Sequence, residues 1–402
     1  MKFSHIADCH IGAWRDPKLK DLSMKAFNQA IDKSISEKVD FILIAGDLFN
    51  TSMPGIDYLK ETTRRLKGLK ELDIPVYIIP GSHDQSPSGK TMLDVLEEAG
   101  LIENVVKGDV IDNKLRLKFT IDKKTGAKIT GLLGRRGMLE RKYYENLDLS
   151  NLEAEQGTKI FMFHTALTEL KPKELEKMDS NPISFLPKGF DYYAGGHVHI
   201  VRNETLEGYK HVVYPGPTFP ASFSELEKLG CGSFYIYNHG KPEYIPIEVV
   251  KIAAIKIDAE HKTPEEISEL IEQTTKDVDY TNTIVLVRIK GKLKSGKPSE
   301  VNLKNSFSKL YSQGAYFVMK NTSKLTSQEF EEIRVDSSSV NEIEEAAIKE
   351  HLGQIKVHFS DKEEEVAREM IKMLSEEKHE GEKVYEYNER IALEIKKIMD
   401  IK

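Results

Sequence analysis

Short, mostly apolar runs alternate with amphipathic stretches over the first hundred residues of this chain. The apolar runs are Lys2–Ala7, Phe41–Ala45 and Pro75–Ile79. The amphipathic stretches are Asp21–Val39, Ile56–Leu69 and Thr91–Ala99. Short apolar runs are typical of buried strands, whereas apolar residues three or four apart are typical of the helices that cover them. The alternation predicts a parallel sheet with right-handed connections.

The pattern changes near residue 105. Between Val105 and Leu133 turn residues crowd together, notably at Asp112-Asn113 and Lys124-Thr-Gly126, which predicts hairpins and therefore a mixed sheet. Four more strands are expected, at Lys159–Phe163, Tyr192–Gly196, Val212–Tyr214 and Ser233–Tyr237. The last two predict an antiparallel end to a first domain at residues 1–250.

Residues 251–325 show a second pattern of strands and helices, with no cluster of His, Cys or carboxylates. The expected strands are Ala253–Ile257, Thr283–Ile289 and Ala315–Lys320, and the expected helices are Pro264–Thr275 and Ser299–Leu310. We interpret this segment as a small α/β capping domain that packs on the first domain or shapes its substrate. A polar, Ser-rich linker is expected to follow at residues 326–360.

Residues 361–402 carry the last periodic pattern, which predicts two amphipathic helices separated at Glu380-Gly381. Their apolar residues stand three or four apart: Val366, Met370, Leu374, Val384, Tyr387, Ile391, Ile395 and Ile398. Such stripes most often pack on their own protein. Because a charged linker precedes the helices and so short a segment buries little surface alone, we favour a helical hairpin that docks on a partner protein.

The composition limits the classes of protein to consider. Of 402 residues, 39% are hydrophobic and 31% are charged, so two or three ordinary globular domains are expected. No apolar run has the length of a membrane span, and two cysteines exclude a disulfide framework and favour the cytoplasm. The formal net charge of −7 argues against nucleic-acid binding by overall charge, so contact with DNA would depend on local basic patches or metal ions.

Seven side chains that can bind metal ions follow the predicted strands. They are Asp8, His10, Asp47, His83, His164, His197 and His199, and they include five of the twelve histidines. Parallel strands end at one edge of a sheet, where open α/β folds place their sites. Within each D-x-H or H-x-H pair, the two side chains share a face because they are two residues apart. A single Asp or His at such a position is usually a cap or a core residue, but the whole set predicts a metal site.

The chemistry of this set fits two metal ions. Hydrolysis of a phosphodiester by two metals needs a carboxylate that bridges ions about 3.5–4 Å apart, and separate ligands for each ion. Asp47 is the natural bridge, and His164 would reach one ion from the opposite side. Carboxylate and imidazole ligands favour manganese, iron or zinc over magnesium, and the scarcity of cysteine argues against structural zinc.

The motifs, in this order, resemble those of the calcineurin-like metallophosphoesterases. They are Asp8-x-His10, Gly46-Asp47, Gly81-Ser-His83-Asp84, His164 and Gly196-His-x-His199. The stretches Ile6–Gly12, Gly46–Phe49 and Tyr214–Gly216 are similar to one branch of that family, the archaeal Mre-type and bacterial SbcD-like nucleases of DNA double-strand-break repair. Specific motifs cover residues 1–250, and the remainder resembles this branch in domain order only. The resemblance implies an αββα sandwich, a capping domain and partner-binding helices.

The resemblance also implies a role for each residue of the site. One Mn²⁺ would be held by Asp8, His10, Asp47 and His199, and a second by Asp47, Ser82, His164 and His197. His83, with Asp84 near it, would face the scissile phosphate and either neutralise its charge or protonate the leaving oxygen.

The sequence departs from the family pattern at two positions. Position 82 is usually Asn and is Ser82 here, and a serine hydroxyl is a shorter and poorer ligand than an amide oxygen. The second ion would therefore bind weakly or take a water in that place. Position 50, commonly a His thought to position the DNA backbone, is Asn50 here, which bears on the strength of any exonuclease.

The function implied is a manganese-dependent DNA nuclease, a 3′–5′ exonuclease and single-strand endonuclease that processes double-strand-break ends. The branch implies a homodimer in a heterotetramer with an SMC-like ABC ATPase of the Rad-fifty type, bound through the C-terminal helices, and a cytoplasmic, nucleoid-associated location. One alternative is a DNA-end tether with a weakened nuclease site. The other is a small-molecule phosphodiesterase or phosphoprotein phosphatase, although Leu48-Phe-Asn50 is not the Asp-Arg-Gly of the phosphatases.

Contacts with DNA would come from loops near the metal site. The candidates are Ser86, Ser88 and Lys90, directly after the metal loop, and the pair Arg135 and Arg136. Hydroxyls, backbone N–H groups and cations are the usual partners of phosphates. The plainer alternative is a surface turn and two solvated arginines.

Overall fold

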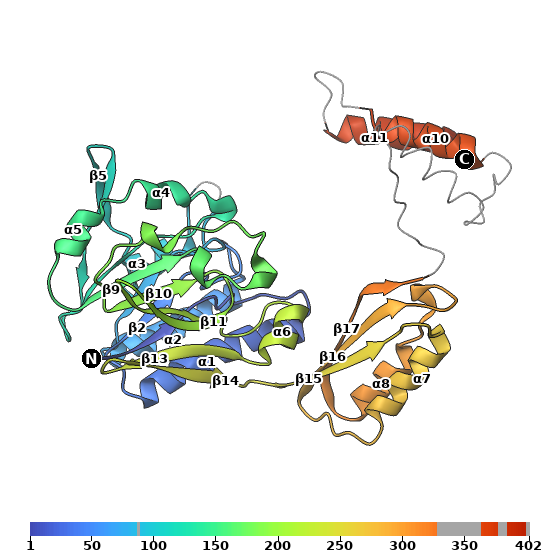
Figure 1. Cartoon of the computed structure of the whole chain (residues 1–402), viewed down its shortest axis with the longest axis horizontal. Coiled ribbons are helices and arrows are strands. Elements are labelled where there is room, and N and C mark those ends of the chain that lie inside the picture. The colour runs from blue at the N-terminus through green and yellow to red at the C-terminus, as the bar shows by residue number, and fades with distance from the viewer. Residues whose placement is uncertain (87–88, 328–362, 377–383, 399–402) are drawn as a thin grey trace. The chain divides into compact units, whose positions relative to one another are not determined.

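Two six-stranded sheets lie face to face in the computed structural model, which describes residues 1–86, 89–327, 363–376 and 384–398 (Figure 1). In the first sheet the order is β14 (Lys241–Ile247), β13 (Gly232–Asn238), β1 (Lys2–Ile6), β2 (Phe41–Ala45), β3 (Val76–Ile79) and β4 (Glu103–Asn104). In the second it is β11 (Val201–Leu206), β12 (Tyr209–Pro215), β10 (Tyr192–Gly196), β9 (Lys159–His164), β8 (Lys128–Gly131) and β7 (Thr120–Ile121). One cluster of buried residues lies between the sheets and one on the outer face of each, which confirms the αββα sandwich.

Helices cover the outer faces of both sheets. The first sheet is covered by α1 (Pro17–Ser36), α2 (Ile56–Glu71) and α3 (Met92–Glu98), and the second by α4 (Arg141–Glu145), α5 (Leu149–Ala154) and brief 3₁₀ turns. Of these helices, α1, α3 and α5 each begin at a capping side chain. α1 begins four residues before the position predicted from periodicity. The start of the helix is set by its N-cap, which the spacing of apolar residues does not reveal. The Asp16 side chain accepts a hydrogen bond from the Lys18 N–H, and Pro17 occupies the first turn.

The predicted hairpins are present, but one strand direction was predicted wrongly. β5 (Gly108–Ile111) and β6 (Lys114–Leu117) turn at Asp112-Asn113, and β7 and β8 turn through Lys124–Gly126. β13 is antiparallel to both of its neighbours, as expected. β12, however, runs parallel to β10. The polar strand β11, which the sequence pattern did not predict, reverses the chain once between them.

The capping segment has the five elements that its sequence predicts. β15 (Lys251–Asp258), β16 (Thr283–Lys292) and β17 (Ala315–Thr326) are parallel, and α7 (Pro264–Thr275) and α8 (Lys304–Ser312) cover one face. α8 begins five residues late, after a 3₁₀ turn at Pro298–Glu300. On the other face, Ile284 and Leu286 join the core beneath α1. Residues 1–326 form one compact unit, so a domain boundary at residue 250 stays a prediction.

Residues 327–402 form a second compact unit that contains α10 (Glu363–Leu374) and α11 (Val384–Ile398). Val366, Met373 and Ile391 are buried in this unit, whereas Leu374 and Leu393 are 57% and 59% exposed. Nearly all of the predicted linker lies outside the described residues. Within the described parts of the chain, no helix has both the length and the apolar character of a membrane span.

Candidate metal centre

The predicted ligands meet at one end of the two facing sheets. Asp8 and Asp47 follow β1 and β2 of the first sheet, while His164 ends β9 and His197 follows β10 of the second. The loops after β1 and β2 continue side by side, because the His10 N–H donates to the carbonyl oxygen of Asp47 at 2.9 Å. The site is therefore built across both sheets of the sandwich.

Five of the predicted ligands have backbone conformations that are unusual for residues with a Cβ. φ is 51° at Asp8, 42° at His10, 52° at Asp47, 96° at His197 and 50° at His199. Such conformations cost on the order of 1–3 kcal/mol each and concentrate at functional sites. The turns that impose them direct the side chains toward one point.

Asp47 occupies the centre of the cluster. Its Oδ2 lies 3.3 Å from His164 Nε2 and 3.6 Å from His10 Nε2. Oδ1 of Asp8 lies 3.8 Å from His199 Nε2, which in turn is 3.0 Å from His10 Nε2. Three overlapping groups have ligand atoms within 4.8 Å of one another: Asp8–His10–His199, His10–Asp47–His83 and Asp8–Asp47–His164. Asp47 belongs to two of these groups, so its position fits the bridging carboxylate of a two-metal site.

A hydrogen bond orients the imidazole of His164 so that its other ring nitrogen faces the cluster. His164 Nδ1 lies 2.8 Å from the carbonyl oxygen of Ala45 and donates to it. Its Nε2 is buried and has no hydrogen-bond partner among the described residues. The nitrogen instead faces Asp47 Oδ2 at 3.3 Å, so this imidazole and this carboxylate are placed to bind the same metal ion.

Glu225 is a functional candidate that the sequence interpretation missed. It lies on α6 (Phe223–Leu229), and its Oε2 is 3.0 Å from His199 Nδ1. The same oxygen accepts the Ala221 N–H at 2.9 Å, and Ser222 caps the helix. The pattern Ser222-x-x-Glu225 was visible as a helix start. Its contact with His199, 26 residues away in the chain, was not.

Two motif glycines allow the close approach of the loops. A Cβ at Gly46, where φ is 86°, would lie 2.2 Å from His164 Nδ1. A Cβ at Gly81 would lie 2.2 Å from Asp47 Oδ1. Any larger residue at either position would displace a predicted ligand.

His83 and Asp84 lie beside the cluster and make different contacts with it. The His83 N–H donates to Asp47 Oδ1 at 2.7 Å, and its Nδ1 is 2.8 Å from the carbonyl oxygen of Asn50. Asp84 is buried and accepts the N–H groups of Gly81 at 2.9 Å and Phe49 at 3.1 Å. Through these contacts Asp84 connects the loop after β2 with the loop after β3. A direct role of Asp84 in catalysis stays a prediction.

Ser82 lies at the edge of the cluster. Its Oγ is 3.5 Å from Asp47 Oδ2, at the outer limit of a hydrogen bond, and the residue is buried. Its role as a ligand of the second metal therefore stays a prediction.

The pKa values divide the histidines into two pairs. Burial lowers the pKa of His10 and of His197 to about 3. Burial also acts against protonation of His164 and His199, but the Asp47 carboxylate raises the pKa of His164 to about 10, and Asp8 with Glu225 raises that of His199 to about 9. Positive charge is thus favoured on the His164 and His199 rings and disfavoured on those of His10 and His197.

A cavity of about 270 Å³ lies next to this cluster. Its lining residues are Ser82, Gln85, Ser86, Gly89, Arg135, Arg136 and Leu139. Arg136 Nε donates to the carbonyl oxygen of Ser82 at 3.3 Å, and the Lys90 N–H donates to Ser86 Oγ at 3.1 Å. The structure therefore brings together the two loops proposed to contact DNA. Ser88 lies outside the described residues.

Residues 1–201, half of the chain, match the sequence profile of the calcineurin-like phosphoesterase family, and the chain belongs to that family. Its relatives include proteins named DNA double-strand break repair protein Mre11. That of Archaeoglobus fulgidus is 28% identical over 65% of this chain and 62% of its own length. Those of Methanococcus maripaludis and Methanocaldococcus jannaschii are 30% and 32% identical, each over 59% of this chain and 62% of its own length.

The chain spans between about half and three-fifths of the length of the curated relatives that it matches first. A solved structure described as a novel archaeal phosphodiesterase aligns at 14% identity over 61% of this chain and 99% of that one. Its TM-score of 0.30 is too low to support a shared fold.

Proposed function

We propose that this protein is a two-metal phosphodiesterase that cuts DNA at the ends of double-strand breaks. The observation that supports this most directly is the position of Asp47, whose Oδ2 is 3.3 Å and 3.6 Å from two imidazole nitrogens. The family supplies the reaction class, and relatives named for DNA double-strand break repair supply the substrate class. The carboxylate and imidazole ligands favour manganese, iron or zinc over magnesium, and the resemblance to the Mre-type nucleases selects manganese among them.

Each residue of the cluster has a role in this proposal. Asp8, His10, Asp47 and His199 would hold one ion, and Asp47, His164, His197 and Ser82 the other. Bound divalent ions supply a hydroxide at neutral pH and clamp the phosphate oxygens. His83 is oriented by the Asn50 carbonyl, which leaves Nε2 to stabilise the phosphate or to protonate the leaving oxygen. Asp84 holds the loop that carries His83.

We also propose the larger assembly. Two copies of the chain would bind DNA ends together with an SMC-like ATPase of the Rad-fifty type, in the cytoplasm on the nucleoid. The ATPase would contact α10 and α11, where Leu374 and Leu393 offer exposed apolar surface. Phosphates of DNA would meet Ser86, Arg135 and Arg136 at the cavity beside Ser82, and Lys90 on the same loop as Ser86.

The test is cleavage of a labelled duplex and a labelled single strand, with Mn²⁺ or Mg²⁺, by wild type and by His83→Ala. His261→Ala is the matched control, because His261 is 80% exposed and lies in the capping segment. We expect manganese-dependent cutting that falls about 10²–10⁴-fold in His83→Ala. The control should cut at the wild-type rate, and metal content should be the same in all three proteins.

Two results would contradict parts of the proposal. Loss of a metal ion in His83→Ala would make His83 a ligand. A wild type that hydrolyses an aryl phosphodiester but cuts no DNA would keep the two-metal site and remove the DNA substrate, which leaves a small-molecule phosphodiesterase or a DNA-end tether.

A further inference from the structure

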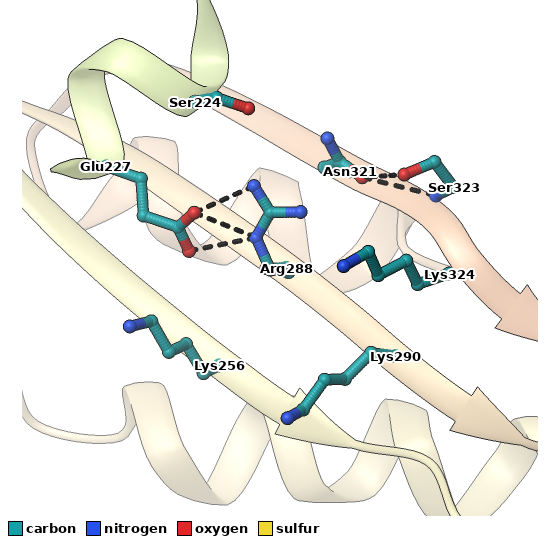
Figure 2. A pocket seen from close by; sticks show the side chains of 8 residues that line it. All are labelled: Ser224, Glu227, Lys256, Arg288, Lys290, Asn321, Ser323 and Lys324. Carbon is teal, nitrogen blue, oxygen red and sulfur yellow. Dashed lines mark hydrogen bonds and ion pairs between the residues drawn. The ribbon is translucent and has the colours of Figure 1, made fainter. Parts of the chain in front are cut away.

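A second polar cavity lies between α6 and the open face of the capping sheet. Its volume is about 540 Å³, within the range of ligand pockets. The lining residues are Ser224, Glu227, Lys256, Arg288, Lys290, Asn321, Ser323 and Lys324 (Figure 2). Four of these eight residues are cations and only one is an acid, although the chain as a whole carries a net charge of −7.

The cations share one face of the sheet. Residues two apart on a strand share a face, so Ile284, Leu286, Arg288 and Lys290 of β16 all lie opposite α7 and α8. The first two pack into the core, whereas the last two line the cavity. In the register, Lys256 and Asn321 flank Arg288, and Lys324 lies beside Lys290. Adjacent strands are about 4.8 Å apart, so the basic groups form a compact patch.

One wall of the cavity is rigidly built. Arg288 forms a bidentate pair with Glu227, in which Nε lies 2.9 Å from each carboxylate oxygen and a terminal nitrogen 2.7 Å from Oε2. The guanidinium also lies 5.0 Å from the ring centroid of Phe223. These hydrogen bonds lower the pKa of Glu227. The single acid of the lining is therefore already neutralised by Arg288.

The remaining charge is not compensated. Lys256, Lys290 and Lys324 are exposed, and none has a carboxylate within ion-pair distance among the described residues. Asp258, which lies beside Lys290 in the register, instead accepts the Glu260 N–H at 3.1 Å. Three ammonium groups around one cavity repel each other unless an anion joins them.

The polar groups of the cavity are arranged as donors. Asn321 Oδ1 accepts from the N–H and the hydroxyl of Ser323, which leaves its NH₂ group to donate to a ligand. Ser224 adds a hydroxyl. No aromatic residue is among the lining, so there is no platform on which a base would stack. Donors and ammonium groups without a stacking ring match phosphate groups better than a nucleoside.

We propose that this pocket binds an anion that carries two or more consecutive phosphate groups. The anion would bridge Lys290, Lys324 and Lys256, with Asn321 donating to a phosphate oxygen. Consecutive phosphates occur in free oligophosphates and in the backbone of a nucleic acid. The second source rests on the proposed nuclease function, because α6 borders this pocket and also carries Glu225, the partner of His199.

The test uses the full chain and the double variant Lys290→Gln, Lys324→Gln. Lys276→Gln with Lys304→Gln is the matched control, since both lysines are exposed and lie at ends of the two helices that cover the other face of the capping sheet, Lys276 directly after α7 and Lys304 at the start of α8. Binding of tripolyphosphate is measured by calorimetry in EDTA, so that no metal at the phosphoesterase site competes for phosphate. We expect the dissociation constant to rise at least tenfold in the pocket variant and less than twofold in the control. Equal weakening in both variants, or no binding by wild type, would overturn the proposal.

A second arm separates the two sources. If a DNA duplex displaces tripolyphosphate from wild type and its own affinity falls in the pocket variant, the ligand is a nucleic-acid backbone. The slope of log affinity against log salt should then shrink by about one for each phosphate that the variant no longer neutralises. If tripolyphosphate binds and DNA does not displace it, the ligand is a free oligophosphate. Neither outcome depends on cleavage, so a failure of the nuclease proposal would be visible separately in the hydrolysis of an aryl phosphodiester.

Discussion

Glu225 Oε2 lies 3.0 Å from Nδ1 of His199, so a carboxylate outside the predicted ligand set orients one of its imidazoles. Although burial raises the pKa of Glu225, the hydrogen bond from His199 and its charge lower it to about 2. The carboxylate is therefore ionised at neutral pH and makes the imidazole a stronger donor to a metal.

Replacement of this carboxylate should weaken metal binding. We expect Glu225→Gln to reduce the affinity for one Mn²⁺ about 10–100-fold in a metal titration, because the neutral amide oxygen replaces a charged acceptor of the His199 N–H. Ser222→Ala is the control, since it removes the cap of α6, about 1 kcal/mol of stability and the hydroxyl that donates to Glu225 Oε1, but leaves Glu225 Oε2 beside His199. Equal loss of metal affinity in Ser222→Ala would show that Glu225 acts through the helix rather than through the ring.

Metal binding should release protons near neutral pH. Without a metal, the carboxylates hold the pKa of His164 at about 10 and that of His199 at about 9, so both rings are protonated. A metal ion needs the neutral ring, so raising the pH removes a competitor, and affinity should rise up to about pH 9–10. Calorimetry in buffers with different ionisation enthalpies should record about two protons released when both sites fill. Affinity that is independent of pH between 7 and 9 would contradict these shifts.

Ser82→Asn should strengthen the second metal site. Ser82 Oγ is 3.5 Å from Asp47 Oδ2, and the adjacent cavity offers room for a longer side chain. The amide oxygen reaches further and is a better neutral ligand than a hydroxyl. We expect tighter binding of the weaker of two Mn²⁺ ions in an equilibrium titration, with the tighter ion unchanged. An unchanged titration would place position 82 outside the metal shell.

Gly81→Ala should impair both metal binding and stability. The added Cβ would lie 2.2 Å from Asp47 Oδ1, too close for any contact, so the bridging carboxylate must move. Gly68→Ala is the matched control: Gly68 lies on α2, and its Cβ would meet no atom within 4 Å. We expect thermal unfolding to show lower stability in the first variant and a gain of about 0.5–1 kcal/mol in the second.

Substitutions at exposed and at buried positions of the C-terminal helices should affect partner binding and folding differently. Leu374 and Leu393 are more than half exposed, whereas Ile391 is buried in the same unit. We expect Leu374→Asp with Leu393→Asp to reduce capture of the proposed ATPase at least tenfold while helix content is unchanged. Ile391→Asp should lower helix content as well. Full ATPase binding by the exposed-leucine variant would place the partner surface elsewhere.

The sequence by itself determined the elements and the ligand motifs. Strand and helix periodicity is a local property, so β1 to β3 were placed to within one residue and the five elements of the capping segment to within six. The metal ligands could also be predicted from local sequence, because each of them ends or follows a strand within a short motif. The order of those motifs along the chain indicated the calcineurin-like phosphoesterase family.

Only the tertiary structure decided how distant segments meet. The direction of β12 depended on β11, a polar strand at the surface. Its sequence has no run of apolar residues from which a strand could be predicted. The contact of Glu225 with His199 depends on where α6 packs, and the basic pocket depends on α6 meeting the capping sheet. Periodicity reports which face of an element is buried, but it does not report which other element buries it. Contacts between residues far apart in the chain therefore had to come from the packed structure.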